Sequence, residues 1–363
     1  MQKKLVQEIS EEILKKSNKI LFLSHLAIGD FVYLQNYFKS FAIKYPNLKI
    51  DLLVDEGRGK SLLNRWSSKK SNYVLYDWLN SCKFFNKIYK DTSSWWDFNK
   101  TVLELKNNNY EIVILISSLR QRRFIKLARK ICSQNCLIAG FKSGKQFFEN
   151  QENILHINNQ NAIFFEKILN TKTTNQERIP FIDIPKDWIL YGKLKFLHWD
   201  IRLDKQNLYQ KNIFINFTAK NKKRCWTFEK VIELIGYFKK DDSFYITNFI
   251  INVMPEQYKD FEKFLKNYSL QKIFLFTATK NFFQLPAVIK HCDLVISVET
   301  SIIHLAAALN IPVVALMRKK NPEWEPVGVK NCIVNADKKR DWIRTINAQH
   351  VFSVTKNFIV ENF

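Results

Sequence analysis

Short runs of apolar residues alternate with longer amphipathic stretches along most of the chain. In the N-terminal half, strand-like segments rich in apolar residues lie at 19–24, 49–54, 111–116 and 136–140. Apolar segments of this length are typical of strands that are buried on both faces. The first two runs flank a stretch with helical spacing that ends before Pro46, and strand, helix and strand in this order form a βαβ unit. This half therefore predicts a parallel, doubly wound sheet.

The C-terminal half repeats this alternation. Strand-like runs lie at 212–216, 243–252, 272–276 and 329–336, helical stretches at 227–239, 256–267 and 282–291, and the segment 293–316 adds a strand, a polar turn, a helix and a second strand. Thr227 precedes the first of these helices as a candidate N-cap. The predicted fold class is α/β, with two Rossmann-like domains, each a doubly wound parallel sheet, facing each other across a cleft.

The segment that precedes the first strand is highly charged, with Leu5, Ile9, Ile13 and Leu14 at helical spacing. It predicts an amphipathic helix, which we expect to pack on the body of the protein, with contact to a membrane surface as the alternative. Two prolines and mixed charge between 180 and 204 indicate an inter-domain connection. The expected organisation is a helix over 1–18, an N-terminal domain over 19–185, a connection over 186–208, a C-terminal domain over 209–342 and a helical tail over 343–363.

Polar side chains gather where the strand that begins at Asp293 passes into the next helix. These residues are Glu299, Thr300, Ser301 and, four positions after Thr300, His304. Ligands of open parallel sheets bind beyond the carboxyl ends of the strands, and a helix N-terminus there favours an anion such as phosphate. The segment therefore predicts a site for a phosphate-bearing small molecule. The competing interpretation makes Glu299, Thr300 and Ser301 helix caps and His304 a core residue.

Two further loops follow predicted strands. Gly29 permits a tight turn after the first strand, and Asp30 begins the next helix, where a carboxylate is either a helix cap or a general base facing the cleft. The loop after 212–216 carries four basic residues, Lys220, Lys222, Lys223 and Arg224. Taken alone, this loop would be interpreted as a solvated loop. Because it lies at the same sheet edge as Thr300, we expect it to form one side of a binding site for a diphosphate.

The net charge indicates which kind of partner the protein binds, and the cysteines indicate the cellular compartment in which it works. The 57 Lys and Arg residues outnumber the 34 Asp and Glu residues, for a net charge of +23. This favours a polyanionic partner, although the abundance of Lys, Asn, Ile and Phe, typical of an AT-rich genome, explains it equally well. Six cysteines are present, and no nearby residue completes a zinc set around the one close pair, Cys132 and Cys136. We expect that pair to be reduced thiols of a cytosolic protein.

Three stretches together resemble a known family. They are the run from Ile20 to Asp30 with its Ala-Ile-Gly-Asp ending, the mid-chain segment from Asn216 through Lys223, Arg224 and Trp226 to the Glu-Leu at 233–234, and the run from Asp293 to Leu316. The chain is similar, over about 19 to 330, to glycosyltransferase family 9, the ADP-heptose:lipopolysaccharide heptosyltransferases. The resemblance implies a GT-B fold with the acceptor on the N-terminal domain and the nucleotide-sugar on the C-terminal domain. It also implies inverting transfer without a metal or cofactor, the nucleotide-sugar being a substrate.

The resemblance carries roles onto individual positions. Asp30 matches the family's catalytic carboxylate, Arg224 matches a lysine that contacts the donor diphosphate, and Thr300 and His304 match donor-binding positions. The other residues expected at the donor are Thr218, Lys220, Lys223, Glu299 and Ser301. Those expected at a phosphorylated Kdo–lipid A acceptor are Gly29, Arg58, Lys60, Arg120 and Arg123. The chain departs from the family at Glu299, usually Asp, at Ser301, usually Gly, and around Ser24 and His25, where the family has a basic residue.

The expected function is heptosyl transfer from an ADP-sugar to the lipopolysaccharide inner core, by a cytoplasmic enzyme held peripherally on the anionic inner membrane. Two other classes stay open. A degenerate homologue would bind nucleotide or glycolipid without turnover, as the changes at Glu299 and Ser301 suggest. A nucleic-acid-binding protein would use the positive charge, but no nucleic-acid-binding motif accompanies it, so no nucleic acid is expected as a partner.

Overall fold

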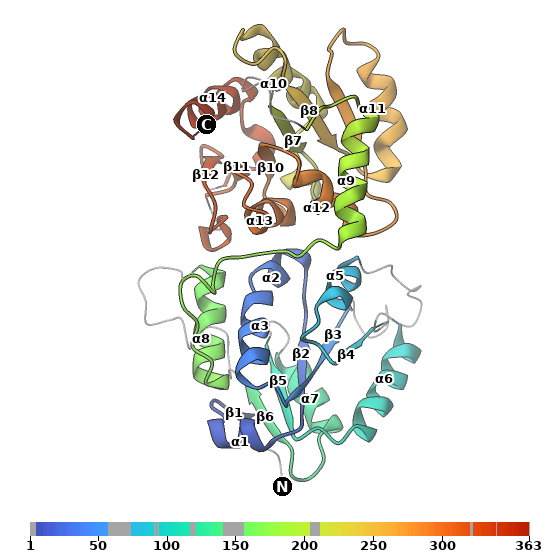
Figure 1. Cartoon of the computed structure of the whole chain (residues 1–363), viewed down its shortest axis with the longest axis vertical. Helices are drawn as coiled ribbons and strands as arrows, with labels where there is room; N and C mark the ends of the chain where they lie inside the picture. Colours follow the sequence, from blue (N-terminus) through green and yellow to red (C-terminus); the bar gives the residue numbers. More distant parts are fainter. Residues whose placement is uncertain are drawn as a thin grey trace. The chain divides into compact units, whose positions relative to one another are not determined.

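The computed structural model describes residues 5–56, 74–90, 92, 94–116, 121–140, 156–203, 211–319, 322–338 and 340–362. The chain divides into two compact units, Met1–Arg178 and Ile179–Phe363 (Figure 1). Each unit holds one six-stranded parallel sheet with helices on its faces. The predicted fold class, two doubly wound parallel sheets, is confirmed.

In unit 1 the strand order is β1-β6-β5-β2-β3-β4. The strands are β1 (Leu5–Val6), β2 (Lys19–Ser24), β3 (Lys49–Val54), β4 (Lys87–Tyr89), β5 (Ile112–Leu115) and β6 (Leu137–Gly140). The helices are α1 (Glu11–Lys16), α2 (Ile28–Val32), α3 (Gln35–Lys44), α5 (Leu75–Ser81), α6 (Trp95–Asn107), α7 (Gln121–Ile131) and α8 (Ile157–Leu169). The direction of strand addition reverses between β2 and β5, which makes the carboxyl end of β2 the topological switch point of this sheet.

Alternate residues of β2 pack on opposite helical layers. Phe22 contacts the rings of Phe38 on α3 and Phe165 on α8, with ring centroids 5.0 and 6.4 Å apart. Leu21 and Leu23 belong to the core cluster on the other side, which includes residues of α6 and α7. A strand covered on both faces has no solvated side, and this explains why the sequence over 20–23 is continuously apolar rather than alternating.

The N-terminal segment is not the single amphipathic helix expected over 1–18. Leu5 and Val6 instead form strand β1, which extends the sheet by pairing with β6. Helix α1 covers only Glu11–Lys16, because the Ser10 hydroxyl caps its start by accepting from the Ile13 N–H. Ile9 and Leu14 are buried in unit 1, so the expectation that the segment packs on the body of the protein is confirmed.

In unit 2 the strand order is β12-β11-β10-β7-β8-β9. The strands are β7 (Asn212–Asn216), β8 (Asn248–Asn252), β9 (Ile273–Phe276), β10 (Leu294–Val298), β11 (Val313–Met317) and β12 (Asn331–Asn335). The helices are α9 (Lys186–His198), α10 (Phe228–Lys240), α11 (Tyr258–Leu265), α12 (Gln284–Ile289), α13 (Ser301–Ala308) and α14 (Ala348–Asn362). Here the reversal falls between β7 and β10. Ile213 and Ile215 of β7 face α10 and α14, and Phe214 faces α9, α12 and α13.

The boundary between the units lies after Arg178, not after residue 185. The segment expected as a connection over 186–208 includes helix α9, whose Phe196 is fully buried in the core of unit 2. Apolar residues at helical spacing in this segment outweigh its prolines, which stand before the helix. Among the described residues, no helix is long and apolar enough to cross a membrane.

The pair Cys132 and Cys136 is a disulfide in the structure, so the expectation of two reduced thiols is wrong. Helix α7 ends at Ile131, and the turn that follows brings the two Cα atoms to 5.4 Å, within the range that a disulfide spans. Cys82, Cys225, Cys292 and Cys332 are free thiols.

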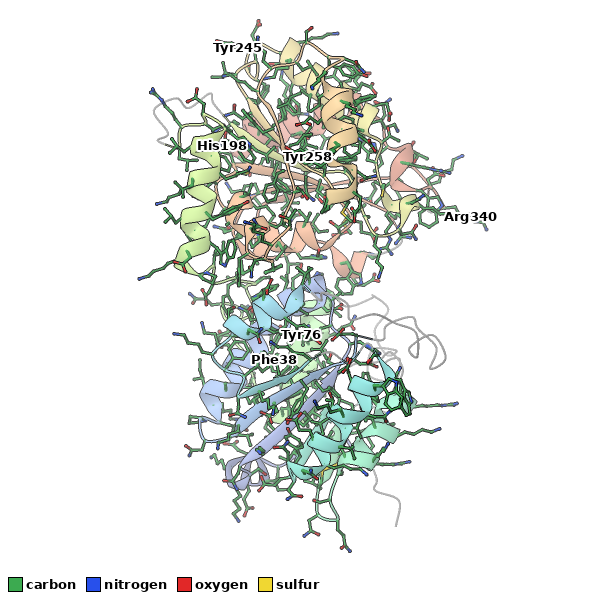
Figure 2. The ribbon with its side chains drawn as sticks, turned by 90° about the vertical axis from the view of Figure 1, so that its right-hand side faces the viewer. Phe38, Tyr76, His198, Tyr245, Tyr258 and Arg340 are labelled. Atoms are coloured by element: carbon green, nitrogen blue, oxygen red, sulfur yellow. A yellow bond between two sulfur atoms is a disulfide. The ribbon has the colours of Figure 1, made fainter. Side chains whose placement is uncertain are left out.

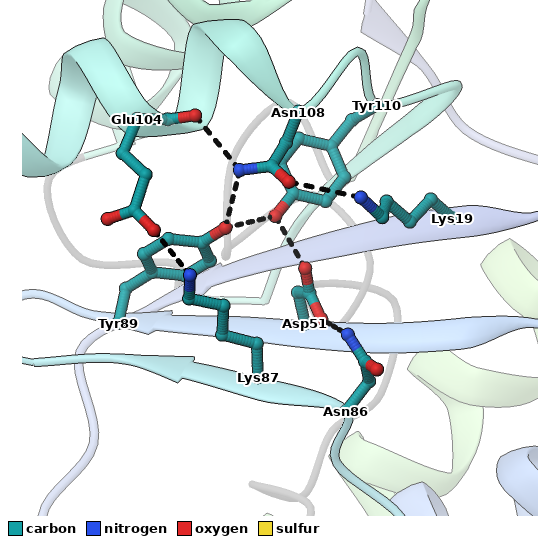
Figure 3. A network of polar contacts seen from close by, with 8 residues as sticks. All are labelled: Lys19, Asp51, Asn86, Lys87, Tyr89, Glu104, Asn108 and Tyr110. Atoms are coloured by element: carbon teal, nitrogen blue, oxygen red, sulfur yellow. Dashed lines mark hydrogen bonds and ion pairs between the residues drawn. The ribbon is translucent and has the colours of Figure 1, made fainter.

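A buried polar network ties the amino-terminal half of β3 to its neighbours in unit 1 (Figure 3). The Asp51 carboxylate accepts from the Tyr110 hydroxyl at 2.6 Å and from Asn86 Nδ2 at 2.7 Å. The Tyr110 hydroxyl also lies 2.8 Å from that of Tyr89, to which Asn108 donates at 3.0 Å. Burial and the adjacent Asp51 raise the pKa of Tyr110 well above its ordinary value, so the phenol stays protonated. Asp51 is thus a satisfied structural carboxylate, remote from the carboxyl edge of the sheet.

Two helical glycines of unit 2 provide a test of packing. A Cβ at Gly192 of α9 would stand 2.5 Å from the carbonyl oxygen of Ala287 in α12, whereas a Cβ at Gly236 of α10 would meet nothing within 4 Å. We expect Gly192→Ala to lower the free energy of unfolding by about 1–3 kcal/mol, because overpacking would force α9 from α12. The control Gly236→Ala should raise it by about 0.5–1 kcal/mol, because alanine loses less conformational entropy in a helix. Denaturant unfolding followed by circular dichroism measures both. A Gly192→Ala variant as stable as the wild type would contradict close contact between α9 and α12.

Candidate functional site

The carboxyl edge of the sheet in unit 2 holds a connected set of polar residues at the switch point between β7 and β10. Asn216, the last residue of β7, directs its side-chain nitrogen at Ser297 Oγ, 3.1 Å away, and at Thr300 Oγ1, 3.2 Å away. Its side-chain oxygen accepts from Asn252 Nδ2 at 2.9 Å. The amide therefore ties the ends of β7, β8 and β10 together where open α/β sheets bind ligands.

Thr300 is the N-cap of α13, with extended backbone and a hydroxyl that accepts from the Ile302 N–H at 3.3 Å. The capping role considered from the sequence is therefore observed for Thr300. Ser301, at the first position of the helix, is half-buried. The first turn of α13 directs its N–H groups toward this sheet edge, where they and the helix dipole favour negative charge. A capping Thr300 and an anion near the same helix end are compatible.

Glu299 is buried and ion-paired to an arginine that sequence analysis missed. Arg318, directly after β11, donates from Nε to Glu299 Oε2 at 3.1 Å and from Nη2 to Oε1 at 3.0 Å. Arg224 approaches the same carboxylate, with Nη1 3.5 Å from Oε1. Because strands β10 and β11 are neighbours, their carboxyl ends bring 299 and 318 together. No spacing pattern in the sequence predicts the ion pair between Glu299 and Arg318.

Trp342 forms an aromatic surface for the same cluster. Arg318 Cζ and Lys223 Nζ each lie 5.2 Å from the centroid of the Trp342 ring, a distance typical of cation–π contact. The cluster of Lys223, Arg224, Glu299, Arg318 and Trp342, called the cationic cluster below, holds three cations against one carboxylate. Its net charge is therefore positive, and Arg224 Nε lies buried with no hydrogen-bond partner among the described residues.

The loop that carries Lys223 and Arg224 has a defined shape. A hydrogen bond from the Trp226 N–H to the Phe217 carbonyl, at 2.8 Å, closes its base. A short 3-10 helix, η1 (Lys222–Arg224), forms its tip, capped by Asn221. Arg224 is half-buried against Glu299, whereas Lys223 and Lys220 are exposed. The loop is therefore partly built into the sheet edge rather than fully solvated.

The remaining donor residues expected from the sequence lie on the same edge. Thr218 is half-buried, and its carbonyl accepts from Asn216 Nδ2 at 3.2 Å. His304 is buried on α13, with its ring centroid 5.8 Å from that of Trp324. The structure thus gathers the predicted donor residues of unit 2 at one sheet edge and adds Asn216, Arg318 and Trp342 to them.

In unit 1, Asp30 lies on the short helix α2 beyond the carboxyl end of β2. Its Oδ2 accepts from the Ala27 N–H at 2.7 Å, so the carboxylate caps the helix as the alternative interpretation expected. The side chain is half-buried, and Gly29 beside it is buried. An ionised carboxylate has about four acceptor sites, so accepting from a backbone N–H does not by itself exclude accepting from a substrate hydroxyl. Capping and catalysis are therefore not exclusive at Asp30.

A second charged group lies at the same edge of unit 1. Asp55, directly after β3, is buried with Oδ2 3.3 Å from Arg123 Nη2 and 3.7 Å from His25 Nε2. The Nδ1 atom of His25 lies 2.7 Å from the Asp55 carbonyl oxygen. Arg123, on α7, is thereby held at the carboxyl edge by a carboxylate that sequence analysis did not single out. Arg58, Lys60 and Arg120, also expected at the acceptor, lie outside the described residues.

Within the described residues, no group of three or more His, Cys, Asp and Glu side chains is arranged to hold a metal ion. Metal-independent transfer and the absence of a cofactor stay predictions.

Comparison with known proteins agrees with this arrangement. Residues 182–342 match the model of glycosyltransferase family 9 (heptosyltransferase). No curated protein matches the sequence. Among solved structures, the glycosyl transferase family 9 protein from Veillonella parvula DSM 2008 is 14% identical, with a TM-score of 0.72 over 96% of this chain and 99% of that one.

Two proteins of E. coli are also similar. ADP-heptose lps heptosyltransferase II is 14% identical, with a TM-score of 0.64 over 94% of this chain and 99% of its own. Heptosyltransferase WaaC, solved with ADP, is 14% identical, with a TM-score of 0.60 over 95% and 97% of the two chains. At this identity the structures show the fold, and the GT-B fold expected from the resemblance is confirmed. Residues 182–342 thus match a glycosyltransferase family 9 domain, and this match, on that shared fold, indicates a glycosyltransferase.

Proposed function

We propose that this glycosyltransferase moves a heptose, or a related sugar, from an ADP-sugar to a Kdo–lipid A type acceptor of the lipopolysaccharide inner core. The transfer is inverting and uses no metal ion. The observation that carries the proposal is the cationic cluster beside the N-terminus of α13, at the switch point of the family-matched unit. Similarity to a heptosyltransferase solved with ADP supports the choice of nucleotide.

In this proposal the diphosphate of the donor binds beside the cationic cluster. Arg224 offers a buried Nε that has no hydrogen-bond partner among the described residues, and Lys223 offers an exposed ammonium. Arg318 adds a guanidinium that Glu299 and Trp342 hold in one orientation. Guanidinium groups form paired, charge-assisted hydrogen bonds with phosphate oxygens. With the N–H groups of α13, they stabilise the charge that develops on the leaving ADP, in place of a metal ion.

Glu299 has a different task from a residue that binds sugar hydroxyls. Both of its carboxylate oxygens are engaged by Arg318, and one also faces Arg224. A bidentate pair of this kind holds the arginine in one orientation and leaves the carboxylate oxygens less available to a sugar hydroxyl. Glu299 therefore positions Arg318 and Arg224.

Asp30 acts as the general base in this proposal. Its carboxylate takes the proton from the acceptor hydroxyl as the oxygen bonds to the anomeric carbon of the sugar. The bond from that carbon to the diphosphate oxygen breaks, and the electron pair leaves with ADP. Attack from the face opposite the leaving group inverts the anomeric centre. Arg123, held by Asp55, is the described residue of unit 1 placed to bind an acceptor phosphate.

A degenerate homologue that binds nucleotide without transfer is the second candidate. The capping contact of Asp30 to the Ala27 N–H favours it, because that contact alone accounts for an aspartate at this position. Product formation separates the two candidates.

Replacement of Asp30 by asparagine tests the catalytic role. Because the asparagine oxygen still accepts from the Ala27 N–H, folding should change by less than about 1 kcal/mol. Loss of the base should reduce the transfer rate by about 10²–10⁴-fold. Turnover of ADP-heptose with a Kdo–lipid A acceptor, followed as ADP release and product mass, measures the rate.

Asp97→Asn is the matched control. Asp97 lies in the first turn of α6 and accepts from the Ser94 hydroxyl at 2.6 Å, so it is another aspartate near a helix start. Its replacement should leave transfer unchanged. Full turnover by Asp30→Asn would show that Asp30 is not the general base. ADP binding without product formation by the wild type would favour the degenerate homologue.

Replacement of Arg224 by glutamine tests the donor site. A charge-assisted hydrogen bond contributes about 1.5–3 kcal/mol, so the affinity for ADP should fall by about 10- to 100-fold in calorimetric titrations. Lys240→Gln, which removes an exposed cation from the end of α10, is the control and should bind ADP like the wild type. Equal ADP affinity in Arg224→Gln and wild type would refute a diphosphate at the cationic cluster.

A further inference from the structure

Helix α9 presents a row of exposed leucines on the surface of unit 2. Leu190, Leu194 and Leu197 are exposed by 55%, 54% and 71%. Spacings of four and three residues place them on one side of the helix. Figure 2 shows α9, which ends at the labelled His198, at the edge of unit 2 with side chains extending from its outer side. The three residues are called the leucine face below.

The opposite side of α9 packs against the body of unit 2. Phe196 is buried in the core, and Gly192 lies so close to Ala287 that an added Cβ would clash with its carbonyl oxygen. The helix therefore cannot rotate to bury the leucine face without breaking this contact. The exposure of the leucines is a consequence of how α9 docks on α12.

Basic residues surround the leucine face. Lys186 and Lys193 on α9 are exposed and lie at helical spacing beside the leucines, and Asp187 is the acidic residue of the same helix. Lys290, at the end of α12, is exposed on the adjoining helix. Burial lowers the pKa of His291, and Lys193 and Lys290 lower it further, which indicates that each ammonium group lies near this histidine. With Arg202 and Asp200 just beyond the helix, both exposed, the border keeps a positive balance.

We propose that the leucine face of α9 is a membrane-contact surface that enters the interfacial layer of an anionic lipid bilayer. The leucine side chains enter between the acyl chains near the headgroups, and Lys186, Lys193 and Lys290 pair with anionic headgroups. A surface helix with an apolar side bordered by lysines binds a membrane in this way. The inference goes beyond the proposed function, because it concerns binding to lipid whether or not sugar is transferred.

A second copy of the chain fits this surface less well. The leucine face extends over about 10 Å of helix, whereas a stable protein interface buries roughly 1,000 Å² or more in total. A symmetric pairing of two such faces would also bring the lysines at their borders close together, and like charges repel. Anionic lipid complements both the apolar centre and the basic border.

The test is flotation of the full chain with vesicles of phosphatidylcholine and phosphatidylglycerol in equal parts, and with vesicles of phosphatidylcholine alone. The wild type should float with the anionic vesicles and much less with the neutral ones. The triple variant Leu190→Ser, Leu194→Ser, Leu197→Ser should lose about tenfold or more in partitioning, because its apolar contribution is gone while its charge is unchanged. Lys186→Gln with Lys193→Gln should weaken binding and reduce its salt dependence.

The control triple variant replaces Ile43, Leu103 and Val360 with serine. These residues are exposed by 70%, 63% and 73% and lie on other helices. The control should bind anionic vesicles like the wild type, and thermal unfolding checks that both triple variants are folded. Equal binding by the leucine variant and the wild type, or no binding by the wild type, would overturn the proposal. So would a wild-type dimer in light scattering that the leucine variant converts to a monomer. ADP titration, which reports on the donor site alone, keeps these outcomes separate from failure of the proposed function.

Discussion

The constraint on which the rest of the structure depends is that the central strands of both sheets are covered on both faces. β7 is buried along its whole length and β2 is buried from Ile20 onward, with side chains directed into two opposite helical layers. A strand in this position admits few polar side chains along its length, because an unsatisfied buried polar group is costly. Polar chemistry is therefore displaced to the strand ends. Asn216, Ser24 and Ser297 mark those ends, and the loops beyond them carry the candidate catalytic and binding residues.

The second determinant is the parallel register between neighbouring strands. Because β10 and β11 run side by side in the same direction, Glu299 and Arg318 emerge at the same edge and form a bidentate pair. A buried carboxylate requires such a partner, since its desolvation is otherwise too costly. Arg224 reaches the same carboxylate from the loop after β7. One buried negative charge thus organises cations from two loops that are far apart in the chain.

Much of the fold could be predicted, and the errors have identifiable causes. Apolar segments of the sequence located the central strands, because a strand that is buried on both faces consists mainly of apolar residues. The N-terminal segment misled the prediction, because Leu5 and Val6 satisfy helical spacing yet pair with β6, and edge pairing leaves little trace in a single sequence. The disulfide between Cys132 and Cys136 was likewise missed, because the turn after α7 decides whether two thiols meet. At the donor edge, Thr300, His304 and Arg224 were found from their loops, but Arg318 and Trp342 were not.

By itself, the sequence determined the class of the protein: two doubly wound parallel sheets, a polar strand–helix junction at 299–304, and the motifs of a sugar-transferring family. These features are local, since each depends on residues within about one supersecondary unit. Tertiary structure alone decided that Arg318 holds Glu299, that Trp342 supports two cations, that Asp55 holds Arg123, and that α9 turns three leucines outward. Each of these relations joins residues that only strand register or helix docking brings together. Contacts of that kind are set by the geometry of packing and leave no spacing pattern along the chain.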